Sequence, residues 1–307
     1  MTALPTVAIA GATGNLGHHV AQAFLSSTFR RSFQDIIILT RSESKQSSDY
    51  ASAGAKIRKY SEDDLVPVLE GVDILISAIG PGGHHFKDSL LKTLSKTSVT
   101  LYFPSEFGVD HYVHTFTHAE WDAKKRHFEL AQKLIPSIRV CRVFAGLFLE
   151  DSIGPWFGFY TAKNKYEAVG SLDQRTSYTS LSDVGRALAV LASMPPHNVP
   201  DQIHLSGDSK SVAEIAEIME EAGADKIALS SVELQPFRAS VLANPSPTPE
   251  RYLRFLMGEG LIDHTDSGLN NDNKYFDEFQ GFGKWKTMRH LAEDTKGKPW
   301  ADHKWDM

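Results

Sequence analysis

The chain of 307 residues is long enough for one large α/β domain or two modest ones with a sizeable core. Its hydrophobic fraction of 41% is ordinary for a globular protein, and its net charge of −6, without a basic block, disfavours nucleic acid and anionic membranes as partners. No apolar run approaches about 18 residues and no cleavable leader opens the chain, which favours a cytoplasmic protein without a membrane segment.

The first half of the chain alternates short apolar runs with amphipathic segments. The apolar runs predict strands at residues 6–10, 35–40, 55–60, 72–79, 99–105 and 138–144, and the segments between them predict helices near 15–28, 63–70, 84–96 and 119–134. Uniformly apolar strands are typical of a parallel sheet that helices cover on both faces. The alternation predicts an α/β fold of the Rossmann type, with a doubly wound parallel sheet and right-handed crossovers.

A glycine-rich turn, within TVAIAGATGNLGHHVAQAF at residues 6–24, joins the first strand to the first helix, as a dinucleotide site requires. Gly11 permits the tight turn, Gly14 lets the backbone approach a pyrophosphate and Gly17 lets the helix pack closely on the strand. The positive end of the helix then faces the anion, and Asn15 is predicted to cap it. A glycine-rich turn without a ligand is the alternative. The predicted cofactor contacts at this turn are Gly11, Thr13, Gly14, Asn15, Leu16 and Gly17.

Arg41 ends the second predicted strand, where a site for NAD usually offers a carboxylate to the ribose diol. A cation at this place accommodates a 2′-phosphate, which a guanidinium binds in a bidentate manner, and Lys45 could assist it. The sequence therefore predicts NADPH or NADP+ as the cofactor, the alternative being that Arg41 is a solvated loop cation. Further cofactor contacts are predicted at Ala78, Ile79, Phe103, Ser105, Lys124 and Phe144.

The ordinary tyrosine mechanism of short-chain dehydrogenases needs a tyrosine four residues before a lysine. None of the nine tyrosines has lysine at that position, so this mechanism is excluded. Instead YFPSEFGVDHY, residues 102–112, follows the fifth strand at the carboxyl edge where doubly wound sheets bind ligands. A helix whose first turn carries Lys124 comes next. The predicted substrate contacts near this edge are Glu106, Phe107, Gly108, His111, Phe148, Trp156 and Phe157.

The histidines at 111 and 114 and the single cysteine are candidates for a metal site, a proton relay or a reactive thiol. His111 and His114 are three apart, but no third ligand follows at convincing spacing, so no metal site is predicted. His111 could instead relay protons in the pocket. Cys141 is the only cysteine, which excludes an internal disulfide, and its apolar run indicates a buried strand rather than a catalytic thiol.

The second half of the chain lacks the regular alternation of apolar runs and amphipathic segments. Just after residue 150 it is rich in aromatic residues and glycine. Helices are predicted over 180–194 and 211–223, the second opening with Ser211 and Glu214 in capping-box spacing. Residues 244–250 form a turn-rich connector before another short helix. Residues 263–283 are predicted to be a surface excursion.

Several of these motifs together resemble the isoflavone reductase-like, or NmrA-like, family of atypical short-chain dehydrogenases: GATGNLG, the arginine after the second strand, FPSEFG and the lysine of WDAK. Residues 143–152 and 177–192 also look like segments of this family, so the likeness covers nearly the whole chain in order. The resemblance implies an NADP(H)-binding Rossmann domain over 1–150 and a smaller substrate lobe over 151–307. The helix near 182–194 would rejoin the first domain.

The resemblance also implies a reaction. In the reductase branch of the family, hydride passes from NADPH to a conjugated or benzylic carbon, often of a phenolic compound. The family's lysine carries over to Lys124 as general acid–base at the substrate oxygen, with Lys125 as the alternative match. Two other activities stay open: an NADP(H)-sensing regulator without turnover, and a non-reductive isomerase or cyclase. The partners that the resemblance suggests are a small aromatic or conjugated substrate and a second copy of the chain in a homodimer.

Overall fold

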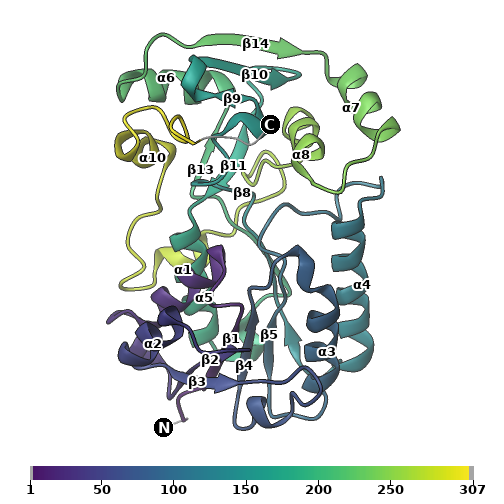
Figure 1. Cartoon of the computed structure of the whole chain (residues 1–307), viewed down its shortest axis with the longest axis vertical. Helices are drawn as coiled ribbons and strands as arrows, with labels where there is room; N and C mark the ends of the chain where they lie inside the picture. Colours follow the sequence, from purple (N-terminus) through teal and green to yellow (C-terminus); the bar gives the residue numbers. More distant parts are fainter. Residues whose placement is uncertain (1–2, 304–307) are drawn as a thin grey trace.

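A six-stranded parallel sheet forms the centre of the computed structural model, which describes residues 3–303 (Figure 1). The strand order is β3-β2-β1-β4-β5-β6, which is the Rossmann order, with the reversal between β1 and β4. The predicted fold class is therefore confirmed. The strands are β1 (Val7–Ala10), β2 (Ile36–Thr40), β3 (Lys56–Lys59), β4 (Ile74–Ser77), β5 (Leu101–Phe103) and β6 (Arg139–Val140).

Helices cover both faces of this sheet, which explains why β1, β2 and β4 are buried at every position. Val7 and Ile9 point into a core shared with α1 (Asn15–Leu25) and α5 (Leu181–Ser193). Ala8, between them, points to the opposite core, which it shares with α3 (His84–Leu94) and α4 (Ala119–Leu134). The short helix α2 (Lys45–Ser52) follows β2.

Residues from the second half of the chain pack back onto the domain that contains the central sheet. β7 (Arg142–Phe144) continues the line of β6 beyond Cys141 and pairs in parallel with β12 (Gln202–His204). Helix α5 packs closely on α1, since a Cβ at Gly185 would lie 2.6 Å from the carbonyl oxygen of His19. The core under α1 is thus completed by residues that come late in the sequence.

Two small sheets and a group of helices form the upper part of the view in Figure 1, around a second hydrophobic core. One sheet holds β8 (Leu147–Phe148), β11 (Thr176–Thr179) and β13 (Asp208–Lys210), and the other holds β9 (Phe159–Tyr160), β10 (Lys165–Val169) and β14 (Ala228–Val232). The helices around this core are α6 (Val212–Glu221), α7 (Leu234–Ala243), α8 (Glu250–Gly258) and α10 (Met288–Asp294), whereas α9 (Lys274–Asp277) packs its Phe276 into the core under α1. Short 3-10 turns lie at Arg30–Ser32, Pro67–Leu69, Pro81–Gly83, Pro155–Phe157, Thr161–Lys163 and Pro196–Asn198.

Four local predictions were wrong. The segment 63–70 holds only a 3-10 turn, since Pro67 cannot continue a helix from the preceding residues. Asn15 does not cap α1: Gly14 is the N-cap, and the Asn15 amide donates to the Asp151 carboxylate at 2.6 Å. Lys124 lies in the second turn of α4, because that helix begins at Ala119. The segment 263–283 is not a plain surface excursion, because it buries His264, Phe276 and Phe282.

Two other features show what sequence patterns do and do not predict. Ser211 and Glu214 form the predicted capping box, with the Glu214 carboxylate accepting from the Ser211 amide at 2.8 Å. Helix α2 was missed because it is polar and has no apolar period; Ser44 and Ser47 start it with a capping box of their own. No helix in residues 3–303 is both long and apolar enough to cross a membrane.

His264 is expected to make folding stability depend on pH. Its ring is fully buried and its Nδ1 donates to the Leu205 carbonyl at 2.9 Å. Burial, and then the charge of His204, lower the pKa of His264 to about 4, from 6.5 in the unfolded chain. The unfolded state therefore binds a proton first, so stability that is present above pH 6.5 declines as the pH falls towards 4, by about 3 kcal/mol in all.

Urea unfolding of His264→Gln across this range tests the expectation. The variant should lose less unfolding free energy than the wild type between pH 6.5 and 4, whereas the exposed control His197→Gln should follow the wild type. Equal slopes for His264→Gln and the wild type would show that this ring does not govern acid stability.

Candidate functional site

The turn between β1 and α1 is closed by backbone atoms that leave no space for side chains. Gly11 has a φ of +86°, and a Cβ there would clash with the Ala78 carbonyl. A Cβ at Gly17 would clash with the Gly11 carbonyl oxygen and lie 2.7 Å from its carbon. The turn is also held from outside, where the Tyr50 hydroxyl donates to the Ala12 carbonyl at 2.8 Å. The amides of the first turn of α1 have no acceptor within the helix and are available to an anion.

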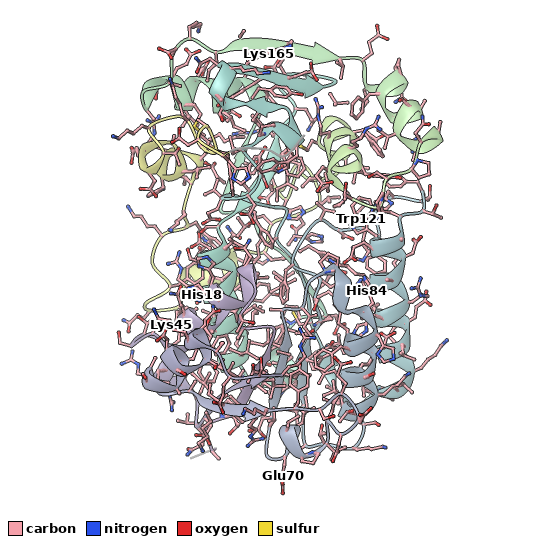
Figure 2. The ribbon with its side chains drawn as sticks, in the orientation of Figure 1. His18, Lys45, Glu70, His84, Trp121 and Lys165 are labelled. Atoms are coloured by element: carbon pink, nitrogen blue, oxygen red, sulfur yellow. The ribbon has the colours of Figure 1, made fainter. Side chains whose placement is uncertain are left out.

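A cavity of about 570 Å³ lies beside this turn, at the carboxyl ends of β1, β2 and β4. This is the strand-order reversal, where open α/β sheets bind ligands. Six of the predicted cofactor contacts line it: Gly11, Thr13, Gly14, Arg41, Ala78 and Ile79. Asn15, Leu16, Gly17 and Lys45 are not among the lining residues. Lys45 is the first residue of α2, and Figure 2 shows it on the opposite side of the view from His84 and Trp121.

The same cavity has lining residues that the sequence interpretation missed. They come from the segments after β2, β3 and β4: Ser42, Ser44, Tyr60, Glu62, Gly80, Pro81, Gly82, Gly83, His85 and Phe86. Tyr60 stacks on Phe86 with ring centroids 4.7 Å apart, which gives this end of the cavity an aromatic wall. The signal that could have found them is topological, because all three segments follow the carboxyl ends of parallel strands in the same sheet.

A second cavity, of about 290 Å³, lies next to the first, and Pro81 lines both. Of the predicted residues, Gly108, Lys124, Phe148, Trp156 and Phe157 line it. Lining residues that were not predicted include Trp121, Glu120, Asp151, Glu250 and Leu253. Among the lining residues in the described part of the chain, Lys124 is the only basic one. The cavity therefore combines aromatic walls with a single amine.

Lys124 is oriented by the FPSEFG turn. Its Nζ donates to the backbone carbonyl of Glu106 at 2.9 Å. That carbonyl is presented by a tight turn, in which the Glu106 amide donates to the Pro104 carbonyl at 2.7 Å and Phe107 takes a φ of +26°. A positive φ at a bulky residue is uncommon, so the turn is locally strained. Lys125, by contrast, lies over the Tyr112 ring at 5.9 Å and is not among the lining residues of either cavity.

Several predicted site residues lie behind the cavities. Phe103 and Phe144 are fully buried and Phe107 nearly so, and none of them is a lining residue of either cavity. Ser105 fixes the end of β4, since its hydroxyl donates to the Ser77 carbonyl at 2.7 Å and accepts from the Ile79 amide at 3.2 Å. Its position supports the wall of the first cavity from behind.

Glu106 and His111 form a buried polar pair behind Lys124, with 3.4 Å between Glu106 Oε2 and His111 Nε2. Burial raises the pKa of Glu106, opposed first by the charge of Lys124. Burial, and then the charge of Lys124, lower the pKa of His111 to about 3. Both effects favour the neutral forms, a protonated carboxyl and a neutral imidazole.

Three histidines precede α4, at positions 111, 114 and 118, and each contacts different neighbours. His114 stacks on Phe116 with centroids 3.9 Å apart, while His118 lies against Trp121 at 4.6 Å. Within residues 3–303 no group of three or more His, Cys, Asp or Glu side chains is arranged to hold a metal ion. These rings pack as aromatic surfaces in the structure.

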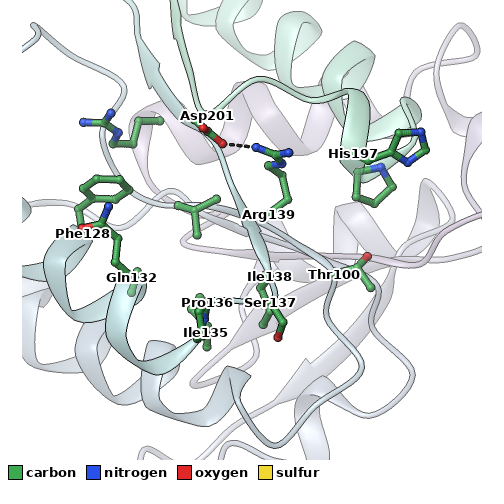
Figure 3. Close-up of a pocket in the computed structure, with 14 residues that line it drawn as sticks. Thr100, Phe128, Gln132, Ile135, Pro136, Ser137, Ile138, Arg139, His197 and Asp201 are labelled. Carbon is green, nitrogen blue, oxygen red and sulfur yellow. Dashed lines mark hydrogen bonds and ion pairs between the residues drawn. The ribbon is translucent and has the colours of Figure 1, made fainter.

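Another cavity, of about 1000 Å³, lies elsewhere (Figure 3). It is bounded by the end of α4 and by the residues that start β5, β6 and β12, so it opens at the amino ends of the strands. Arg139 and Asp201 form an ion pair across it. None of the predicted site residues lines it, and the ligand edge of a doubly wound sheet is the opposite one.

Comparisons with known proteins concern the family and the fold of the chain. Residues 4–259 match a sequence model described as the NmrA-like family. The chain is 25% identical over 215 residues to an NmrA-like family domain-containing oxidoreductase of Gibberella moniliformis, covering 68% of this chain and 70% of the relative. It is 28% identical over 191 residues to the phenylcoumaran benzylic ether reductase PT1 of Pinus taeda, covering 58% of this chain but only 62% of that relative, less than two thirds of its length.

A solved structure shows a similar fold. The leucoanthocyanidin reductase–NADPH complex from Vitis vinifera superimposes with a TM-score of 0.74 at 17% identity, covering 95% of this chain and 99% of the other. At this identity the likeness establishes the architecture.

Proposed function

The chain belongs to the NmrA-like family, and from this premise we propose that it is an NADPH-dependent reductase of the isoflavone reductase-like kind, acting on a small aromatic or conjugated metabolite. One observation carries the proposal. The cavity at the glycine turn and the aromatic cavity that holds Lys124 adjoin at Pro81. A dinucleotide along the first would extend towards a substrate in the second.

The residues present fit such a dinucleotide. Gly14, the N-cap of α1, and Arg41 both line the first cavity, which thus adjoins the start of the helix and a guanidinium, an arrangement suited to a pyrophosphate and a 2′-phosphate. A Cβ at Gly80 or Gly82 would meet no protein atom within 4 Å, so these lining residues leave space for a ligand against the backbone. The solved neighbour crystallised with NADPH supports the same cofactor.

NADPH, when bound, would supply a hydride. The chain's own residues would do the rest. Trp121, Trp156 and Phe157 would pack on a flat substrate and exclude water, and Lys124 Nζ would give a proton to, or take one from, the substrate oxygen. The Glu106 carbonyl would hold the amine towards the cavity. The proposed mechanism thus needs one titrating side chain at the reacting atoms.

Arg41 is expected to set the preference for NADPH over NADH. Arg41→Ala should weaken NADPH binding by about 10- to 100-fold and change NADH binding little, because only NADPH carries the 2′-phosphate. Fluorescence titration of the reduced nicotinamide measures both affinities. Lys45→Ala is the matched control, since Lys45 is exposed and not among the lining residues. Equal losses for the two cofactors would show that Arg41 does not contact this phosphate.

The reaction itself is tested by following NADPH absorbance with a panel of phenylpropanoids and unsaturated ketones. Oxidation of NADPH that depends on one of these compounds is the expected result. Tight NADPH binding without consumption by any compound, together with capture of a protein partner that depends on the cofactor's redox state, would support the regulator instead. Product formation with no net change in nicotinamide would support the isomerase or cyclase.

A further inference from the structure

The cavity of about 1000 Å³ at the amino ends of the strands takes no part in the proposed mechanism (Figure 3). Apolar residues from the end of α4, from the turn that follows it and from β6 line much of this cavity: Phe128, Ala131, Ile135, Pro136, Ile138 and Val140. Concave surfaces that combine apolar walls with a few polar groups are typical of sites for small organic molecules.

The charged lining residues of this cavity do not balance one another. They are Arg139, Arg142 and Asp201. Asp201 is paired with Arg139, and Figure 3 shows this pair with Phe128 on one side of it in the view and His197 on the other. The pair is largely exposed, so it is weak and open to competition from another anion. One guanidinium remains unneutralised, in a chain whose net charge is −6.

The groups that hold the Arg142 guanidinium are uncharged. Its Cζ lies over the Phe128 ring at 4.1 Å and over the Tyr112 ring at 4.7 Å. Its Nη2 donates to the Gln202 side-chain oxygen at 2.6 Å. Within residues 3–303 no carboxylate forms an ion pair with it. The Glu106 carboxyl is influenced by its charge, but burial favours the neutral form of that carboxyl.

This arrangement prepares Arg142 to bind an anion. Aromatic rings stabilise a guanidinium through its faces, whereas its N–H donors lie in its own plane, where they match the planar geometry of a carboxylate. Because the rings and Gln202 already hold the side chain, less conformational entropy is lost when a ligand binds. Arg139 supplies a second guanidinium in the same cavity.

We propose that this cavity is a second ligand site, which binds a small carboxylate with an apolar body. Arg142 and Arg139 would hold the carboxylate, and Phe128 and its apolar neighbours would contact the body of the ligand. The site lies at the edge of the sheet opposite the glycine turn, so this ligand and NADPH would bind at the same time. The inference is independent of the proposed reductase function.

Isothermal titration calorimetry with 2-naphthoate, and with its uncharged counterpart 2-naphthamide, tests the proposal. We expect 2-naphthoate to bind at one site, at least about tenfold more tightly than 2-naphthamide, because only the carboxylate can pair with a guanidinium. Saturating NADPH should leave the affinity for 2-naphthoate unchanged. Displacement of 2-naphthoate by NADPH would place the anion at the glycine turn and overturn the proposal.

Two substitutions should change the affinity for 2-naphthoate in opposite directions. Arg142→Gln should weaken it by about tenfold or more and leave 2-naphthamide within about twofold. Asp201→Asn should strengthen it by about threefold, because the carboxylate that competes for Arg139 is removed, a gain that a merely structural effect would not produce. Arg126→Gln is the matched control and should change nothing, since Arg126 is exposed on α4 and is not a lining residue.

If Arg142→Gln does not fold, Arg142→Lys replaces it. Lysine keeps the charge but lacks the planar fork, so the affinity for 2-naphthoate should fall by about threefold. The proposal is overturned if the wild type does not bind 2-naphthoate, or binds it no more tightly than 2-naphthamide. It is also overturned if the folded Arg142 variant binds 2-naphthoate as the wild type does.

Discussion

Replacing Lys124 with methionine is expected to reduce kcat by at least about 100-fold, the usual contribution of a positioned general acid–base. The physical reason is that Lys124 is the only basic side chain among the lining residues of the aromatic cavity within residues 3–303. Methionine keeps most of the side-chain volume but carries no transferable proton. NADPH binding should stay within about threefold of the wild type, because the cavity at the glycine turn does not include Lys124.

Lys125→Met is the control for this experiment. Lys125 is adjacent in sequence but lies over the Tyr112 ring, so its replacement should change kcat by less than about threefold. Steady-state kinetics on the first compound that the enzyme reduces give both values. If Lys124→Met retains turnover while Lys125→Met loses it, the roles of the two lysines are exchanged.

Gly17→Ala is expected to destabilise the fold by on the order of 3 kcal/mol, in the upper range for single substitutions. The added methyl would clash with the carbonyl of Gly11, which is backbone that cannot rotate away as a side chain would. Relief requires α1 to shift from β1, which would also open the anion site at the start of that helix. Urea unfolding and NADPH titration should therefore both show a loss.

Gly14→Ala separates these two effects. A Cβ at Gly14 would lie 3.3 Å from the Gly11 carbonyl oxygen, a tight but adjustable distance, and Gly14 is exposed towards the first cavity. Stability should fall by about 1 kcal/mol or less, whereas NADPH binding should weaken by about tenfold or more because the methyl occupies space meant for the pyrophosphate. Unchanged NADPH affinity in this variant would place the pyrophosphate elsewhere.

The sequence predicted the fold well because two kinds of evidence indicate the same elements in this chain: the periodicity of its apolar residues and the residues that typically begin and end helices. Helix α4 was predicted at 119–134 and is found at Ala119–Leu134, with Asp122 and Glu120 in its first turn. Helix α2 escaped prediction because serine hydroxyls, rather than an apolar stripe, define it. Periodicity reports which face of an element is buried and says little about short polar helices.

The site was only partly predictable for a related reason. A strand sends successive side chains to opposite faces, so Phe103 at the end of β5 enters the core under α1, although the end of its strand lies at the ligand edge. Tyr60 and Glu62 line the first cavity from a loop whose path depends on the packing of β3 and α3. Local patterns identify the turn that holds a phosphate, while loop paths depend on contacts distant in sequence.

The pairing of β12 with β7, and of α5 with α1, has a consequence for how the protein is made. Val20 and Phe24 leave the ribosome early, yet their partners on α5 follow about 160 residues later, and Phe276 and Phe282 join the same cluster later still. Until then the apolar face of α1 stays exposed in the nascent chain, and chaperones act on exposed apolar surfaces of this kind. The order in which these segments are synthesised thus differs from the order in which they can pack together.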